Sequence, residues 1–191
     1  MKKSLPVLGL AAFLLLLSAS LAWAAPGGVS NPSALKQLAA VRQATHKYHD
    51  VGVAEADGYV STEECVQVPG MGGMGIHYVN GALLGDISVD HLAPEVLLYV
   101  PADDGLKLVA VEYVMTALAL VDGVPQPWLE VTPPPGEVWV TTNPVLFGQT
   151  FNGPMPPHGP GEPWHYELHA WVWQGNAHGV FADFNPNLSC S

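Results

Sequence analysis

The sequence predicts an α+β domain in which one N-terminal helix packs on a curved antiparallel β-sheet or partial barrel. Apolar residues recur at helical spacing between residues 33 and 56, and β-rich runs separated by turn residues dominate from residue 59 onward. The chain has 191 residues and shows no internal repeat. This length fits one domain with a substantial core.

The predicted helix covers residues 33–56. Ser30 or Asn31 before Pro32 is typical of a helix start, and Gly58 is expected to end the helix. Residues at spacings of three and four place one apolar face on this helix. They are Val41, Ala44, Tyr48 and Val51.

The rest of the chain is expected to form strands. Residues 101–105, with the sequence Pro-Ala-Asp-Asp-Gly, indicate a hairpin turn between two β-rich runs. Clustered prolines from residue 125 to 135 interrupt the next region. The expected strands cover residues 75–80, 95–100, 106–115, 138–141 and 164–173.

The N-terminus has the pattern of a secretory signal peptide over residues 1–24. Lys2 and Lys3 precede an apolar run, and Ala22-Trp23-Ala24 fits the cleavage pattern. An uncleaved anchor is the alternative, although the run is short for a membrane span. We therefore expect a secreted or periplasmic protein with no membrane span after cleavage, a flexible leader over residues 25–32 and a single α+β domain over residues 33–191.

Two cysteines, Cys65 and Cys190, are present. In an oxidising compartment they are expected to form a disulfide, with two free thiols as the alternative. Acidic residues outnumber basic ones by 17 to 6. This balance argues against nucleic acid or an anionic lipid surface as a partner, and it favours cations.

Residues 164–173, Trp-His-Tyr-Glu-Leu-His-Ala-Trp-Val-Trp, carry the densest set of chemically active side chains. Alternation along a strand places His165, Glu167, His169, Trp171 and Trp173 on one face, and the other face is ordinary core. Neighbours on that face are about 6.6 Å apart and can share a metal ion, but residues four apart are separated by about 13 Å. A straight strand therefore lets only one of His165 and His169 bind a given ion.

Two other strands supply ligand-type residues. His77 lies in a short strand, and Glu112 lies in an apolar run where a carboxylate is expected to be paired or bound to a cation. The structural alternatives are a core histidine bonded to backbone and a carboxylate that accepts from a buried Tyr or Trp. His158 and Glu167 are reserve candidates, and His46 and His49 have ligand spacing on the helix.

At these residues the chain resembles a family of small secreted proteins, mainly bacterial, that has no established activity. The likeness covers nearly the whole mature chain and is carried by a Met-Gly-x-His-Tyr-x-Asn motif at residues 74–80 and by residues 151–173. Gly81 and Ala177 depart from the family, which usually has proline there, so His178 is interpreted as incidental. The resemblance implies that five residues belong to the family pattern. They are His77, Glu112, His158, His165 and His169.

The leading hypothesis is a pocket that binds a divalent metal ion, zinc or copper, with an undetermined catalytic role. Its predicted ligands are His77, Glu112, His165 and His169. The alternatives are a metal-free module that binds a small molecule between Trp171, Trp173 and Tyr78, and a structural envelope protein. The chain has no nucleophile elbow, phosphate loop or dinucleotide fingerprint.

Overall fold

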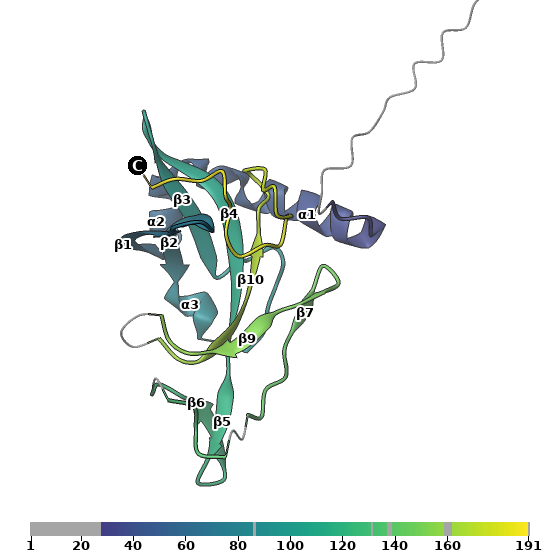
Figure 1. Ribbon diagram of the computed structural model, residues 1–191, viewed down its shortest axis with the longest axis vertical. Coiled ribbons are helices and arrows are strands. Elements are labelled where there is room, and N and C mark those ends of the chain that lie inside the picture. Colours follow the sequence, from purple (N-terminus) through teal and green to yellow (C-terminus); the bar gives the residue numbers. More distant parts are fainter. Residues whose placement is uncertain (1–27, 86, 131, 137–138, 159–161, 191) are drawn as a thin grey trace, which may run out of the picture.

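A computed structural model describes residues 28–190, except residues 86, 131, 137–138 and 159–161 (Figure 1). The predicted signal peptide, residues 1–24, and residues 25–27 of the predicted leader lie outside the described residues. Among the helices that are described, none is long and apolar enough to cross a membrane.

The fold is α+β, as predicted, with N-terminal helices preceding a six-stranded antiparallel sheet that curls into a half-barrel (Figure 1). The strand order in this sheet is β1-β2-β3-β4-β10-β9, and the hairpins β5-β6 and β7-β8 are separate. In chain order the elements are α1 (Pro32–Thr45), η1 (His46–His49), α2 (Val51–Ala56), β1 (Tyr59–Val68), β2 (Gly72–Asn80), α3 (Gly81–Leu84), β3 (Val96–Ala102), β4 (Gly105–Thr116), β5 (Leu118–Val121), β6 (Val124–Pro127), β7 (Val145–Leu146), β8 (Gln149–Thr150), β9 (Asn152–Met155) and β10 (His165–Ala170).

The prediction of one uninterrupted helix over residues 33–56 was wrong, because the chain breaks into α1, η1 and α2. Asn31 caps α1 by accepting a hydrogen bond from the Ser33 amide at 2.9 Å. At Asp50 the backbone is extended, and the Asp50 side chain accepts from the Gly52 amide at 3.0 Å to start α2. Aspartate competes for backbone hydrogen bonds in this way, and Gly52 has low helix propensity, so the helix is interrupted here.

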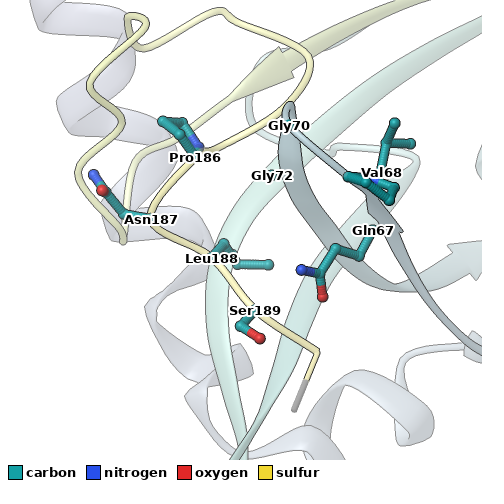
Figure 2. A pocket seen from close by; sticks show the side chains of 9 residues that line it. Gln67, Val68, Gly70, Gly72, Pro186, Asn187, Leu188 and Ser189 are labelled. Atoms are coloured by element: carbon teal, nitrogen blue, oxygen red, sulfur yellow. The ribbon is translucent and has the colours of Figure 1, made fainter.

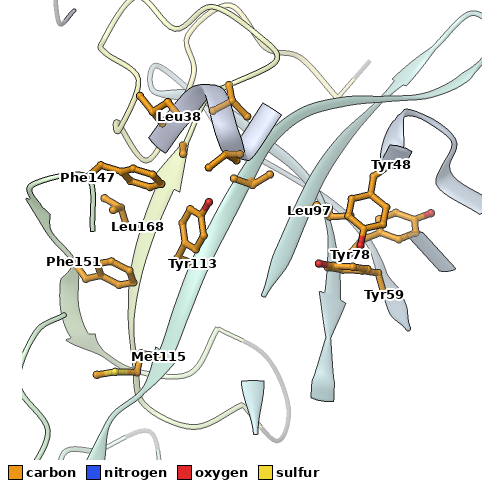
Figure 3. Close-up of a cluster of buried hydrophobic side chains, with 14 of the residues drawn as sticks. Leu38, Tyr48, Tyr59, Tyr78, Leu97, Tyr113, Met115, Phe147, Phe151 and Leu168 are labelled. Atoms are coloured by element: carbon orange, nitrogen blue, oxygen red, sulfur yellow. The ribbon is translucent and has the colours of Figure 1, made fainter. Parts of the chain in front are cut away.

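Helix α1 packs on one face of the sheet, which we call the helix face. Leu38 and Val41 of α1 lie in the same buried cluster as Tyr113 of β4 and Leu168 of β10 (Figure 3). A group of tyrosines extends this cluster toward β1 and β2. Its members are Tyr48, Tyr59, Tyr78 and Tyr99, and neighbouring rings lie 5.2 and 4.9 Å apart.

The opposite face, which we call the site face, is covered by the chain after β10. Trp171 and Leu188 pack there against Leu98 and Val114 in a second buried cluster. The amide and carbonyl of Asn185 both bond to Gly73 in β2. This segment therefore closes over the sheet.

The predicted disulfide between Cys65 and Cys190 is confirmed, with the two Cα atoms 5.8 Å apart. It fastens the segment after β10 to strand β1. Between this segment and the turn of β1 and β2 lies a pocket of about 420 Å³, lined in part by Gln67, Gly70 and Leu188 (Figure 2). None of the histidines lines this pocket.

The hairpin of β3 and β4 is present at the predicted turn, with Ala102 paired to Gly105. The last predicted strand is shorter than expected, because β10 ends at Ala170. Of the strand predicted over residues 138–141, the described part makes only an isolated bridge between Trp139 and Ala119, and Val138 lies outside the described residues. The short strands β5 to β9 were not predicted, because runs of two to four residues carry no clear periodicity.

Candidate metal centre

The pairing of three strands brings ligand-type side chains to the site face. Strands β4 and β10 pair with His169 opposite Glu112, so these two side chains share a face. On β2, His77 pairs with Leu98 of β3, which belongs to the same face. Alternation then places Tyr166, Leu168 and Ala170 on the helix face, where they lie in the core as expected.

The first cluster consists of His77, Glu112 and His169, whose ligand atoms lie within 4.8 Å of one another. Glu112 lies between the two imidazoles. Its Oε2 is 3.6 Å from Nε2 of His77, and its Oε1 is 3.9 Å from Nε2 of His169. These separations are too long for hydrogen bonds. They are close to the 3.3–3.6 Å, roughly, that separates two ligands on a tetrahedral ion with bonds of about 2.0–2.2 Å.

The side chain of His169 is fully buried, and among the described residues neither of its ring nitrogens has a hydrogen-bond partner. A buried polar group left without a partner costs about 1–3 kcal/mol. Buried polar side chains in native proteins nearly always have a partner, and a bound ion can serve as that partner. The unpaired nitrogens of His169 therefore indicate a ligand that would complete the site.

The structural alternative for Glu112 was a bond from a buried Tyr or Trp. Three buried donors of β4, β10 and the segment after β10 bond to backbone carbonyls instead. The Tyr113 hydroxyl donates to His91 O at 2.8 Å, and the Trp171 indole donates to Ala182 O at 2.6 Å. The Tyr166 hydroxyl donates to Thr141 O at 2.9 Å. These donors are therefore occupied away from Glu112.

Burial controls the protonation of the first cluster. Burial and the neighbouring His169 lower the pKa of His77 to about 4, and burial lowers the pKa of His169 as well. Both imidazoles are therefore neutral near pH 7 and can offer a lone pair. Burial, together with the neighbouring Glu167 carboxylate, raises the pKa of Glu112 well above its ordinary value. A cation that binds here would displace the Glu112 proton.

The second cluster consists of His158, His165 and Glu167, whose ligand atoms also lie within 4.8 Å of one another. Nδ1 of His165 is 3.0 Å from the Pro163 carbonyl oxygen, which can only accept, so Nδ1 carries the proton of this bond. Nε2 of His165 then faces Oε2 of Glu167 at 3.6 Å. Burial is the largest influence on Glu167 and opposes its ionisation, but the interactions with His165, His169 and Glu112 together outweigh burial and lower the pKa of Glu167 to about 2.

Asp183 also reaches this region, although it was not among the residues predicted from the sequence. It forms a third group with Glu167 and His169, again within 4.8 Å, and accepts a hydrogen bond from the Asn152 side chain at 2.9 Å. The only signal in the sequence is an acidic residue between aromatic neighbours, Phe181 and Phe184. That pattern does not show that a loop folds back over β10.

The four predicted ligands do not meet at one point. His169 joins His77 and Glu112, whereas His165 lies in the second cluster. His46 and His49 are exposed and pack against Trp173, with ring centroids 6.1 and 4.3 Å from the indole. They lie with the helix elements, away from the site face.

The aromatic pocket of the metal-free alternative does not form as expected. Trp171 is buried on the site face, but Trp173 contacts the helix elements because the strand has already ended at Ala170. Tyr78 makes an edge-to-face contact with Tyr99 in the helix-face core. The three rings therefore lie in different parts of the fold.

The chain matches no family model, no curated protein and no solved structure. The resemblance to a family of small secreted proteins therefore stays a prediction.

Proposed function

We propose that this protein binds a divalent metal ion, zinc or copper, through the first cluster. The observation that carries the proposal is the position of Glu112. Each of its oxygens faces a histidine Nε2, at 3.6 and 3.9 Å, and the buried His169 has no hydrogen-bond partner among the described residues. Neither of these two separations is a hydrogen bond, and coordination of a shared ion would account for both of them.

The ligand set supports a borderline metal. Two imidazoles and one carboxylate suit zinc or copper better than calcium or magnesium, which prefer oxygen ligands. Three protein ligands leave a fourth position open, as in zinc sites that bind water or substrate. Lowered histidine pKa values favour binding, because protons compete less with the metal at neutral pH.

The test uses protein purified without a histidine tag, dialysed against zinc and then analysed for bound metal. His77→Ala should lose one equivalent, because His77 supplies one of the three ligands of this ion. His178→Ala is the matched control, since His178 is exposed and lies outside the cluster, and it should keep the full complement. The His77 side chain is only 18% exposed, so far-UV circular dichroism must show that its truncation leaves the fold intact.

The outcomes separate the competing functions. Wild-type protein that binds neither zinc nor copper in stoichiometric amounts would leave the structural role of the histidines as the better explanation. Equal metal contents in the His77 and His178 variants would show that the bound metal lies elsewhere.

A further inference from the structure

The site face carries more ligand-type side chains than one ion needs. The first cluster alone supplies three, and β10 links it to the second cluster through Glu167 and to Asp183 through Glu167 and His169. His165 and Glu167 of the second cluster are almost fully buried, with side-chain exposures of 2% and 7%. Side chains of a solvated surface patch would be exposed, so these two residues do not belong to such a patch.

The second cluster has its own features of a ligand site. The bond from Nδ1 to Pro163 O fixes the orientation of the His165 ring and leaves Nε2 directed at Glu167. A backbone carbonyl that holds the second nitrogen of an imidazole is the usual outer-sphere support of a histidine ligand. The ring of His158 stands edge-on to His165, with centroids 5.1 Å apart, so a third ligand is within reach.

The two clusters are joined through their carboxylates. Glu112 lies opposite His169, and Glu167 precedes His169 by two residues on the same face of β10, so the two buried carboxyl groups are diagonal neighbours across the strand pair. Each carboxylate also faces a histidine of its own cluster, at 3.6 Å in both cases. Two neighbouring carboxylates with histidines on either side are a ligand set that would suit a pair of cations about 3.5–4 Å apart.

We propose that the second cluster is a second divalent-metal site and that Glu112 and Glu167 bridge two ions in one dinuclear centre. This inference rests on the proposed function of the first cluster. The ions are of the same borderline class, zinc or copper, since two imidazoles and a carboxylate recur. Ions in such pairs lie about 3.5–4 Å apart and can hold one oxygen ligand between them.

The test is the metal content of four proteins without tags after dialysis against zinc. Wild-type protein and His178→Ala should bind two ions each. His158→Ala and His77→Ala should each bind one ion. His158 and His178 are both exposed. The two substitutions therefore remove the same side chain from similar surroundings, and they differ only in the predicted role of the residue.

The outcomes distinguish the two proposals. One ion in wild-type protein that is lost in His77→Ala and kept in His158→Ala overturns the second site and leaves the first standing. No ion in wild-type protein overturns both. Copper supplies a second readout, because two bridged Cu²⁺ ions couple magnetically. The paramagnetic resonance signal should grow with the first equivalent and weaken with the second, and additive signals from two equivalents would overturn the bridge.

Discussion

Replacing Glu112 by glutamine should remove most of the stabilisation that metal gives the fold. A ligand that binds only the native state stabilises it by RT ln(1 + [L]/Kd), which is about 2.7 kcal/mol when free metal is 100 times Kd. For a domain of this size, that corresponds to a rise in melting temperature of about 5–11 °C. Wild-type protein should show this rise on addition of zinc.

The loss follows from the geometry of Glu112. Its carboxylate faces both histidines of the first cluster, so the amide removes one of three ligands and the negative charge. Loss even of a residue that only supports a ligand lowers metal affinity by about 10–100-fold. At a 100-fold loss, free metal equals the Kd of the variant, and the stabilisation falls to about 0.4 kcal/mol.

The assay is calorimetric melting of each protein with and without zinc, so that any effect on the metal-free fold serves as the reference. Glu64→Gln is the control because it makes the same change of charge on an exposed part of β1. An equal zinc-induced rise in the Glu112 and Glu64 variants would refute the assignment of Glu112 as a ligand.

Two further predictions concern the fold itself. Reducing the disulfide, which joins residues separated by 125 positions, should lower the free energy of unfolding by about 5 kcal/mol if chain entropy dominates. Urea unfolding with and without reductant measures this, and a change below about 1 kcal/mol would contradict it. Burial raises the pKa values of Tyr59, Tyr99 and Tyr113, whose hydroxyls donate to backbone carbonyls. Their contribution to stability is therefore complete below pH 10 and is lost as the pH rises above it. Tyrosinate absorbance should show these residues ionising only as the protein unfolds, and ionisation at pH 10 with the fold intact would contradict this.

The sequence was a good guide where periodicity was strong. Alternation in residues 164–170 predicted which side chains of β10 face the core, and the turn at residues 101–105 predicted the hairpin of β3 and β4. The helix was misjudged at Asp50, because its spacing pattern continues through a residue that caps a new helix instead. Local capping chemistry overrode the pattern there.

For the candidate site, the sequence predicted which residues take part better than it predicted how they are grouped in space. Residue types and faces pointed to His77, Glu112 and His169, but the register that sets Glu112 opposite His169 depends on long-range pairing that the sequence does not display. The strand-spacing argument predicted that His165 and His169 would not bind the same ion, but it did not predict that His158, His165 and Glu167 form a cluster of their own. Asp183 was not predicted because it lies in a loop, and a loop has no periodic pattern of apolar residues from which the direction of its side chains could be inferred.

The register of β4 and β10 makes the site sensitive to insertions and deletions in a specific way. A slip of one residue would turn His165, Glu167 and His169 toward the helix face, where α1 leaves no room for charge. A slip of two residues would keep the face but could set Glu167 directly opposite Glu112, which would remove His169 from its position across the strand pair. Of these alignments, the observed one gives Glu112 a histidine across the strand pair. A change in loop length between these strands is tolerable only if it leaves that alignment intact.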